Sequence, residues 1–114
     1  MTFRDDRQTN RAVRVLLASV GLANLWTFDG PTDRAVALLE ANGGTLSSGE
    51  AFLLLVAFDI FNGHGNATIG RLLGVLDAGR TELVAGLLVA VASGAEHVDV
   101  WLEQNEPKTK LEAI

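Results

Sequence analysis

The residues of this chain that are best suited to chemistry are Asp59 and His64, which lie close together in the sequence. A carboxylate beside an imidazole can fix the tautomer of the ring and prepare it for general acid–base catalysis. Asn62, Asn66 and Arg71 add further polar groups to the same region. If these five side chains converge, they form a ligand-binding or catalytic site.

A structural role for Asp59 competes with this interpretation. Asp59 is surrounded by apolar residues in the sequence, near the expected C-terminus of a helix, where the helix dipole disfavours an anion. A buried carboxylate needs a partner. The backbone amides of residues 63–66, or the side chains of Arg71 or Arg80, can supply one. We favour this structural role over catalysis.

No cofactor or metal site is predicted. The Gly63-His64-Gly65 stretch lacks the lysine of a P-loop and the preceding strand of a dinucleotide site, so its glycines are expected to end one helix and start the next. His64 and His97 do not have the spacing of metal-ligand pairs. The acidic and amide residues from Asp59 onward do not follow the calcium-loop pattern either.

Composition excludes several classes of protein. A chain of 114 residues fits one domain, and we expect a single helical domain over 1–114, with flexible ends at about 1–8 and 107–114. The net charge of −5 argues against direct nucleic-acid binding, which relies on basic side chains. There is no cysteine, hence no disulfide framework and no thiol nucleophile. No signal-peptide pattern is visible, and we expect a cytoplasmic protein.

The stretch that must position Asp59 and His64 is a predicted helix over residues 48–62. Ser47 and Glu50 have the spacing of a capping box. The following run, residues 52–61, is apolar except for Asp59, and its large side chains point in all directions around a helix. Such a helix is buried on all sides. It is too short for a membrane span, which needs about 20 apolar residues, and Gly63 ends it.

The remaining segments are expected to surround this central helix. The fold class predicted is all-α, a compact array of five or six short helices. Residues 96–104 fit a helix face but also alternate like an edge strand, and we favour a helix because no strand partner is evident. The other predicted helices run from Thr9 to about Trp26, from Pro31 to about Ala41, from the cap Asn66 to the stop Gly79, and over 82–93 after the cap Thr81.

Two features indicate contacts with a partner. Residues 82–93 are nearly all apolar, and on one side of this helix Ala85, Gly86 and Ala92 would let another backbone approach closely. A small chain with two such helices has more apolar surface than it can cover, so we expect a homodimer. The competing expectation is that this side packs against the helix that begins at Thr9.

The second feature is an acidic stripe, which forms if residues 96–104 are helical. Glu96, Asp99 and Glu103, followed by Glu106, then lie along one side. Charged runs are usually solvated faces, but this one is also a candidate partner-binding surface. In a weaker alternative, the stripe mimics a nucleic acid.

These patterns favour a non-enzymatic protein–protein interaction module, a small self-associating regulator or inhibitor. The alternative is a small-ligand-binding protein or an enzyme that uses the region around Asp59 and His64. A pocket beside His64 with converging polar groups would favour the alternative. A closed core there, with an apolar patch elsewhere, would favour the interaction module.

Overall fold

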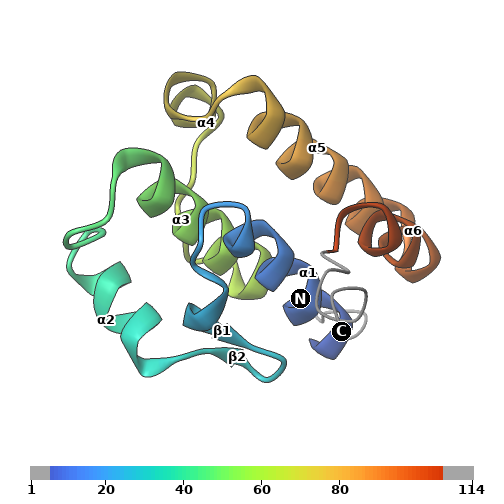
Figure 1. Ribbon diagram of the computed structural model, residues 1–114, viewed down its shortest axis with the longest axis horizontal. Coiled ribbons are helices and arrows are strands. Elements are labelled where there is room, and N and C mark those ends of the chain that lie inside the picture. Colours follow the sequence, from blue (N-terminus) through green and yellow to red (C-terminus); the bar gives the residue numbers. More distant parts are fainter. Residues whose placement is uncertain (1–5, 107–114) are drawn as a thin grey trace, which may run out of the picture.

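The fold is all-α, as predicted, with one short hairpin added. The computed structural model describes residues 6–106, and Figure 1 shows the arrangement of their elements. In chain order these are α1 (Asp6–Ala18), the 3-10 turn η1 (Ala23–Leu25), β1 (Trp26–Thr27), β2 (Gly30–Pro31), α2 (Asp33–Glu40), α3 (Ser48–Asn62), α4 (Ile69–Val75), α5 (Ala78–Ser93) and α6 (Ala95–Asn105).

Helix α3 is the central element, and its predicted limits are confirmed. The Ser47 hydroxyl accepts the backbone N–H of Glu50, and the Glu50 carboxylate accepts the N–H of Ser47, so the predicted capping box is present. Gly63 ends the helix in the left-handed conformation, with φ 79°. Buried side chains lie on several sides of α3: Phe52, Leu53, Leu54, Val56, Ala57 and Phe58.

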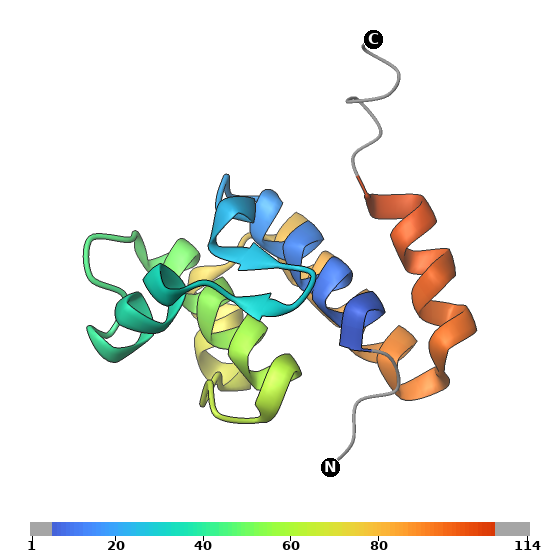
Figure 2. The ribbon, with the colours of Figure 1, turned by 90° about the horizontal axis from the view of Figure 1, so that it is seen from below.

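The hairpin closes one side of α3, packed beside α1 (Figure 2). Trp26 is fully buried, and its ring meets Phe58 edge-on, with the ring centres 5.1 Å apart. The indole N–H donates to the side-chain oxygen of Asn10, whose amide donates in turn to the Phe28 carbonyl, each over 2.9 Å. Asn10 is itself buried, and these two bonds satisfy its oxygen and its amide group.

The limits predicted for the first helix are wrong at both ends. Residues 6–8, expected to be flexible, are helical, because Gln8 donates to the Asp99 carboxylate and to the Ala95 carbonyl. The helix ends at Ala18 rather than near Trp26, since the chain turns at Gly21 with φ 78°. The other predicted flexible residues, 1–5 and 107–114, lie outside the described part of the chain.

Three predicted helix starts also need correction. Pro31 belongs to β2, where it lies opposite Trp26, and Thr32 caps α2. Asn66 does not cap α4; it adopts φ 60°, and Thr68 is the cap. Helix α5 begins about one turn earlier than expected, at the cap Asp77 instead of Thr81. In each case an alternative capping side chain lies within a few residues.

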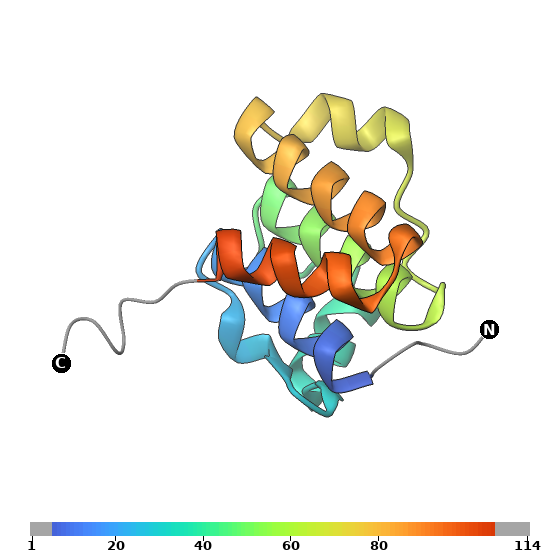
Figure 3. The same ribbon diagram turned by 90° about the vertical axis from the view of Figure 1, so that its right-hand side faces the viewer.

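Helix α6 confirms the prediction of a helix rather than an edge strand over residues 96–104. It lies beside α5 and also contacts α1, so that the C-terminal helices cover the N-terminal one (Figure 3). Within residues 6–106, no helix is long and apolar enough to cross a membrane.

Phe58→Ala should lower the free energy of unfolding by about 3–5 kcal/mol, because the side chain is 4% exposed and packs on Trp26. Phe28→Ala is the matched control, since Phe28 is 43% exposed and its loss should cost clearly less. Urea unfolding followed by circular dichroism measures both. Equal losses would contradict the central position of α3.

Candidate functional site

Asp59 has the structural role that we favoured. One carboxylate oxygen accepts the backbone N–H groups of Gly65 and Asn66, at 2.8 and 2.9 Å, and the other accepts that of Ala67 at 2.7 Å. These three bonds compensate a carboxylate that is half-buried near the C-terminus of α3. They also fix the direction in which the chain leaves α3 toward α4.

The other residues of the predicted ligand site do not meet at Asp59. His64 is exposed, and its backbone N–H donates to the Asn62 side chain at 3.0 Å. Between His64 and Asp59 the structure shows no side-chain hydrogen bond. Arg71 lies over the ring of Phe52, 5.6 Å from its centre, and does not pair with Asp59. Ligand binding by these residues stays a prediction.

Gly65 is a second structural residue of this loop, and its role was not predicted. It is buried, and its backbone lies directly against α3. A Cβ atom at this position would overlap the Leu55 carbonyl oxygen and would lie 2.8 Å from the Asp59 nitrogen. We had expected Gly65 to start the next helix, and this expectation is wrong. It allows the loop to come close enough for its amides to reach Asp59.

An apolar groove with a volume of about 420 Å³ lies next to this loop. Three helices form it. Among residues 6–106, the polar residues that line it are Asp59 in the last turn of α3 and Thr68, the cap of α4. The apolar walls include Phe52, Val56 and Ile60 of α3, Leu72 of α4, and Val84 and Leu88 of α5.

Large apolar side chains project into solvent around this groove. Ile69 and Leu73 of α4 are 77% and 69% exposed, and Leu88 and Val89 of α5 are 48% and 66% exposed. With about 100° of rotation per residue, the exposed residues Ala85, Leu88, Val89 and Ala92 lie on the same side of α5. We use the name groove face for the groove together with the exposed residues of α4 and α5 that line it or directly follow a lining residue in the sequence. Ile69, Leu88 and Ala92 line the groove, and Leu73, Ala85 and Val89 follow Leu72, Val84 and Leu88.

Helix α4 contributes to the groove face without a core of its own. It has seven residues, none of them buried, and two of them are glycines with nothing within 4 Å of an added Cβ atom, Gly70 and Gly74. A helix this short is marginal in isolation, and each interior glycine costs about 1 kcal/mol relative to alanine. Its Thr68 cap and its packing on α3 support it, whereas Ile69 and Leu73 remain in water.

The small-residue side predicted on α5 is divided between two environments. A Cβ atom on Gly86 would lie 3.4 and 3.5 Å from two ring atoms of Trp101, so Gly86 makes room for α6 in the same chain. Ala85, Gly86 and Ala92 are all exposed, and Ala92 also lines the groove. The competing expectation was that this side of α5 packs against the first helix. Gly86 instead packs against Trp101 of α6.

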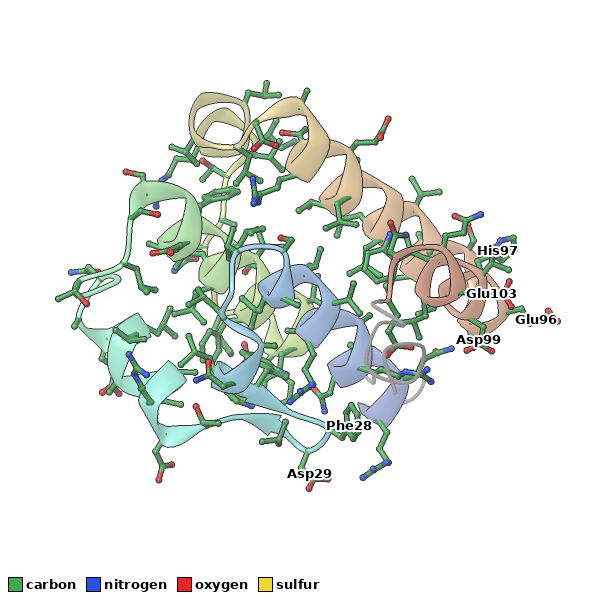
Figure 4. The ribbon with its side chains drawn as sticks, viewed as in Figure 1. Phe28, Asp29, Glu96, His97, Asp99 and Glu103 are labelled. Atoms are coloured by element: carbon green, nitrogen blue, oxygen red, sulfur yellow. The ribbon has the colours of Figure 1, made fainter. Side chains whose placement is uncertain are left out.

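The acidic stripe forms on α6, and part of it is occupied by α1. Figure 4 shows Glu96, Asp99 and Glu103 at the end of the molecule away from α4. Asp99 accepts a hydrogen bond from Gln8 at 2.8 Å. Next to it, Glu106 forms a two-bond ion pair with Arg11, which raises the pKa of that guanidinium. Partner binding and nucleic-acid mimicry by the stripe stay predictions.

No protein-family model, curated protein or solved structure matches this chain. Among residues 6–106, no three histidine, aspartate or glutamate side chains gather in a way that could hold a metal ion. The groove face is therefore the candidate functional site because of its geometry and exposure. The sequence alone did not reveal it, because the spacing of the apolar residues in 69–76 is equally typical of a helix that faces the core.

Asp59→Leu should lower the free energy of unfolding by about 2–4 kcal/mol, because three backbone amides lose their acceptor. Asp59→Asn keeps an acceptor oxygen and should cost about half as much. His64→Ala is the control and should change stability by less than about 0.5 kcal/mol, since the side chain is exposed. If Asp59→Leu were as stable as the wild type in urea unfolding, the capping role would be ruled out.

Two glycine-to-alanine variants test the close approach of the loop to α3. Gly65→Ala should destabilise the protein by about 3 kcal/mol or more, because the overlap is with backbone atoms that cannot move away. Gly70→Ala, in open space on α4, should stabilise it by up to about 1 kcal/mol. Thermal melts measure both changes, and equal effects of the two substitutions would contradict this geometry.

Proposed function

We propose that this protein is a non-enzymatic protein–protein interaction module, a small self-associating regulator or inhibitor, and that it acts through the groove face. The observation that carries the proposal is the border of the groove, where four large apolar side chains are between 48% and 77% exposed. Monomeric proteins rarely leave apolar surface gathered in this way, and such patches mark interaction sites.

The shape of the groove face suits a helical partner. Its walls come from three helices, and its border carries Ile69 and Leu73 on one side and Leu88 on the other. An amphipathic helix binds such a groove by placing apolar side chains from successive turns into it. Burial of the exposed groups would contribute roughly 25 cal/mol for each Å² removed from water.

A binding role is better supported than catalysis. Both Asp59 oxygens already accept backbone amides, and the exposed His64 forms no side-chain hydrogen bond with them. The second candidate function is the binding of a small apolar molecule, and the groove volume of about 420 Å³ supports it, since small-molecule sites usually span about 300–1,000 Å³. We keep the cytoplasm as the proposed location, because the chain has no cysteine.

A photo-reactive residue on the groove face should identify the partner. In the native host, p-benzoylphenylalanine in place of Leu73 should form a covalent adduct with one defined protein, which mass spectrometry identifies. The same replacement at Val100, which is 52% exposed on α6, is the control and should not give this adduct. The absence of an adduct at position 73, or the same adduct at both positions, would count against the proposal.

A further inference from the structure

We propose that the groove face binds an amphipathic helix of another protein that carries basic side chains beside its apolar ones. The apolar side chains of this helix would fill the groove, and a lysine or arginine would reach Asp59. The inference rests on the proposed function and specifies the chemistry of the segment that occupies the groove face.

Asp59 is the charged residue that lines the groove among residues 6–106. Its Oδ1 atom accepts two backbone N–H groups, whereas Oδ2 accepts one, from Ala67 at 2.7 Å. Each carboxylate oxygen has two lone pairs, so Oδ2 retains an acceptor site. The side chain is half-buried in a wall that is otherwise mostly apolar. A basic side chain that approached along the groove would form a charge-assisted hydrogen bond there.

The end of the groove that contains Asp59 is also where two helices end. Figure 3 shows that α3 and α5 run in the same direction. Ile60 of α3 and Val91 and Ala92 of α5 line the groove from the last turns of these helices. The C-terminus of a helix carries a partial negative charge, which favours a nearby cation. The N–H groups that precede α4 do not offset this preference, because they already donate to Asp59.

The surface around the groove adds further negative charge. Glu82 is exposed and lies two turns before Val89, on the same side of α5. Beyond the C-terminus of α5, helix α6 carries the exposed Glu96 at the end of the molecule away from α4 (Figure 4). No ion pair joins either glutamate to a basic side chain of residues 6–106. With the net charge of −5, these groups attract a cationic segment.

The basic residues of α4 and α5 do not cancel this charge. Arg80 pairs with Asp77 at 2.6 Å. Arg71 lies over the ring of Phe52 and lines a separate cavity of about 140 Å³ instead of the groove. A cationic partner therefore meets no unpaired positive charge along the groove lining.

The exposed apolar residues of the groove face favour a helix over other cationic or apolar ligands. Ile69, Leu73 and Val89 are between 66% and 77% exposed, and a small molecule inside the groove would leave much of this surface in water. A helix can cover the groove and the residues around it together. An anionic membrane surface also receives apolar side chains, but the acidic groups of this face would be repelled by it.

Binding of two designed peptides to the full chain tests the proposal. The first is an amphipathic helix of about 14 residues made of leucine and lysine, and the second has glutamate in place of every lysine. In fluorescence anisotropy, the leucine–lysine peptide should bind at least about 10-fold more tightly, and its affinity should fall as the salt concentration rises. Equal binding of the two peptides, or binding of neither, would overturn the proposal.

Two pairs of exposed variants distinguish the groove face from general attraction to an acidic protein. Glu82→Lys should weaken binding of the leucine–lysine peptide by at least about fivefold. Glu40→Lys, the same change on α2 at the far side of the molecule (Figure 1), should weaken it by less than about twofold. Leu73→Ser should weaken binding by about 10-fold, whereas Val100→Ser on α6 should have little effect.

Circular dichroism shows whether the four variants remain folded. Equal effects within either pair would overturn the proposal. The photo-adduct at position 73 separates this inference from the proposed function. If the protein that it identifies contacts the groove face through a segment without basic side chains, the proposed function stands and the basic helix is ruled out.

Discussion

The rest of the structure depends on the need to cover α3, a helix with apolar side chains on all of its sides. Exposing such a helix to water is unfavourable, so the neighbouring elements cover most of α3. Helix α1 and the hairpin cover one side, where Trp26 packs edge-on against Phe58. Helix α4 covers the opposite side incompletely, because it is short and buries none of its residues. The groove is the part of the α3 surface that the single chain leaves uncovered.

The residue that looked most like a catalyst helps to build the wall of this groove. Asp59 places a carboxylate in an apolar helix, and three backbone amides from the following loop compensate it. Gly65 makes this possible by allowing the loop backbone to lie against α3. Together they set the point from which α4 begins, and therefore the opening of the groove. The carboxylate of Asp59 is thus explained by its hydrogen bonds to the loop between α3 and α4, without a catalytic role.

Two surfaces of different character lie on the C-terminal half of the chain, one on α6 and one on α4 and α5. The surface on α6 is acidic, and α1 partly neutralises it through the Arg11–Glu106 pair and the bond from Gln8 to Asp99. The surface on α4 and α5 is apolar, with Ile69, Leu73, Leu88 and Val89 exposed.

The sequence by itself determined the features that depend on neighbouring residues. The limits of α3, its capping box, the stop at Gly63 and the helical state of α6 follow from side chains a few positions apart, so local rules predict them. The tertiary structure decided which apolar residues are covered. Val84 and Trp101 are buried, whereas Ile69 and Leu73 remain exposed, although all four positions look equally suited to a core. The physical reason is that burial depends on elements distant in the chain, and neither periodicity nor capping specifies how those elements meet.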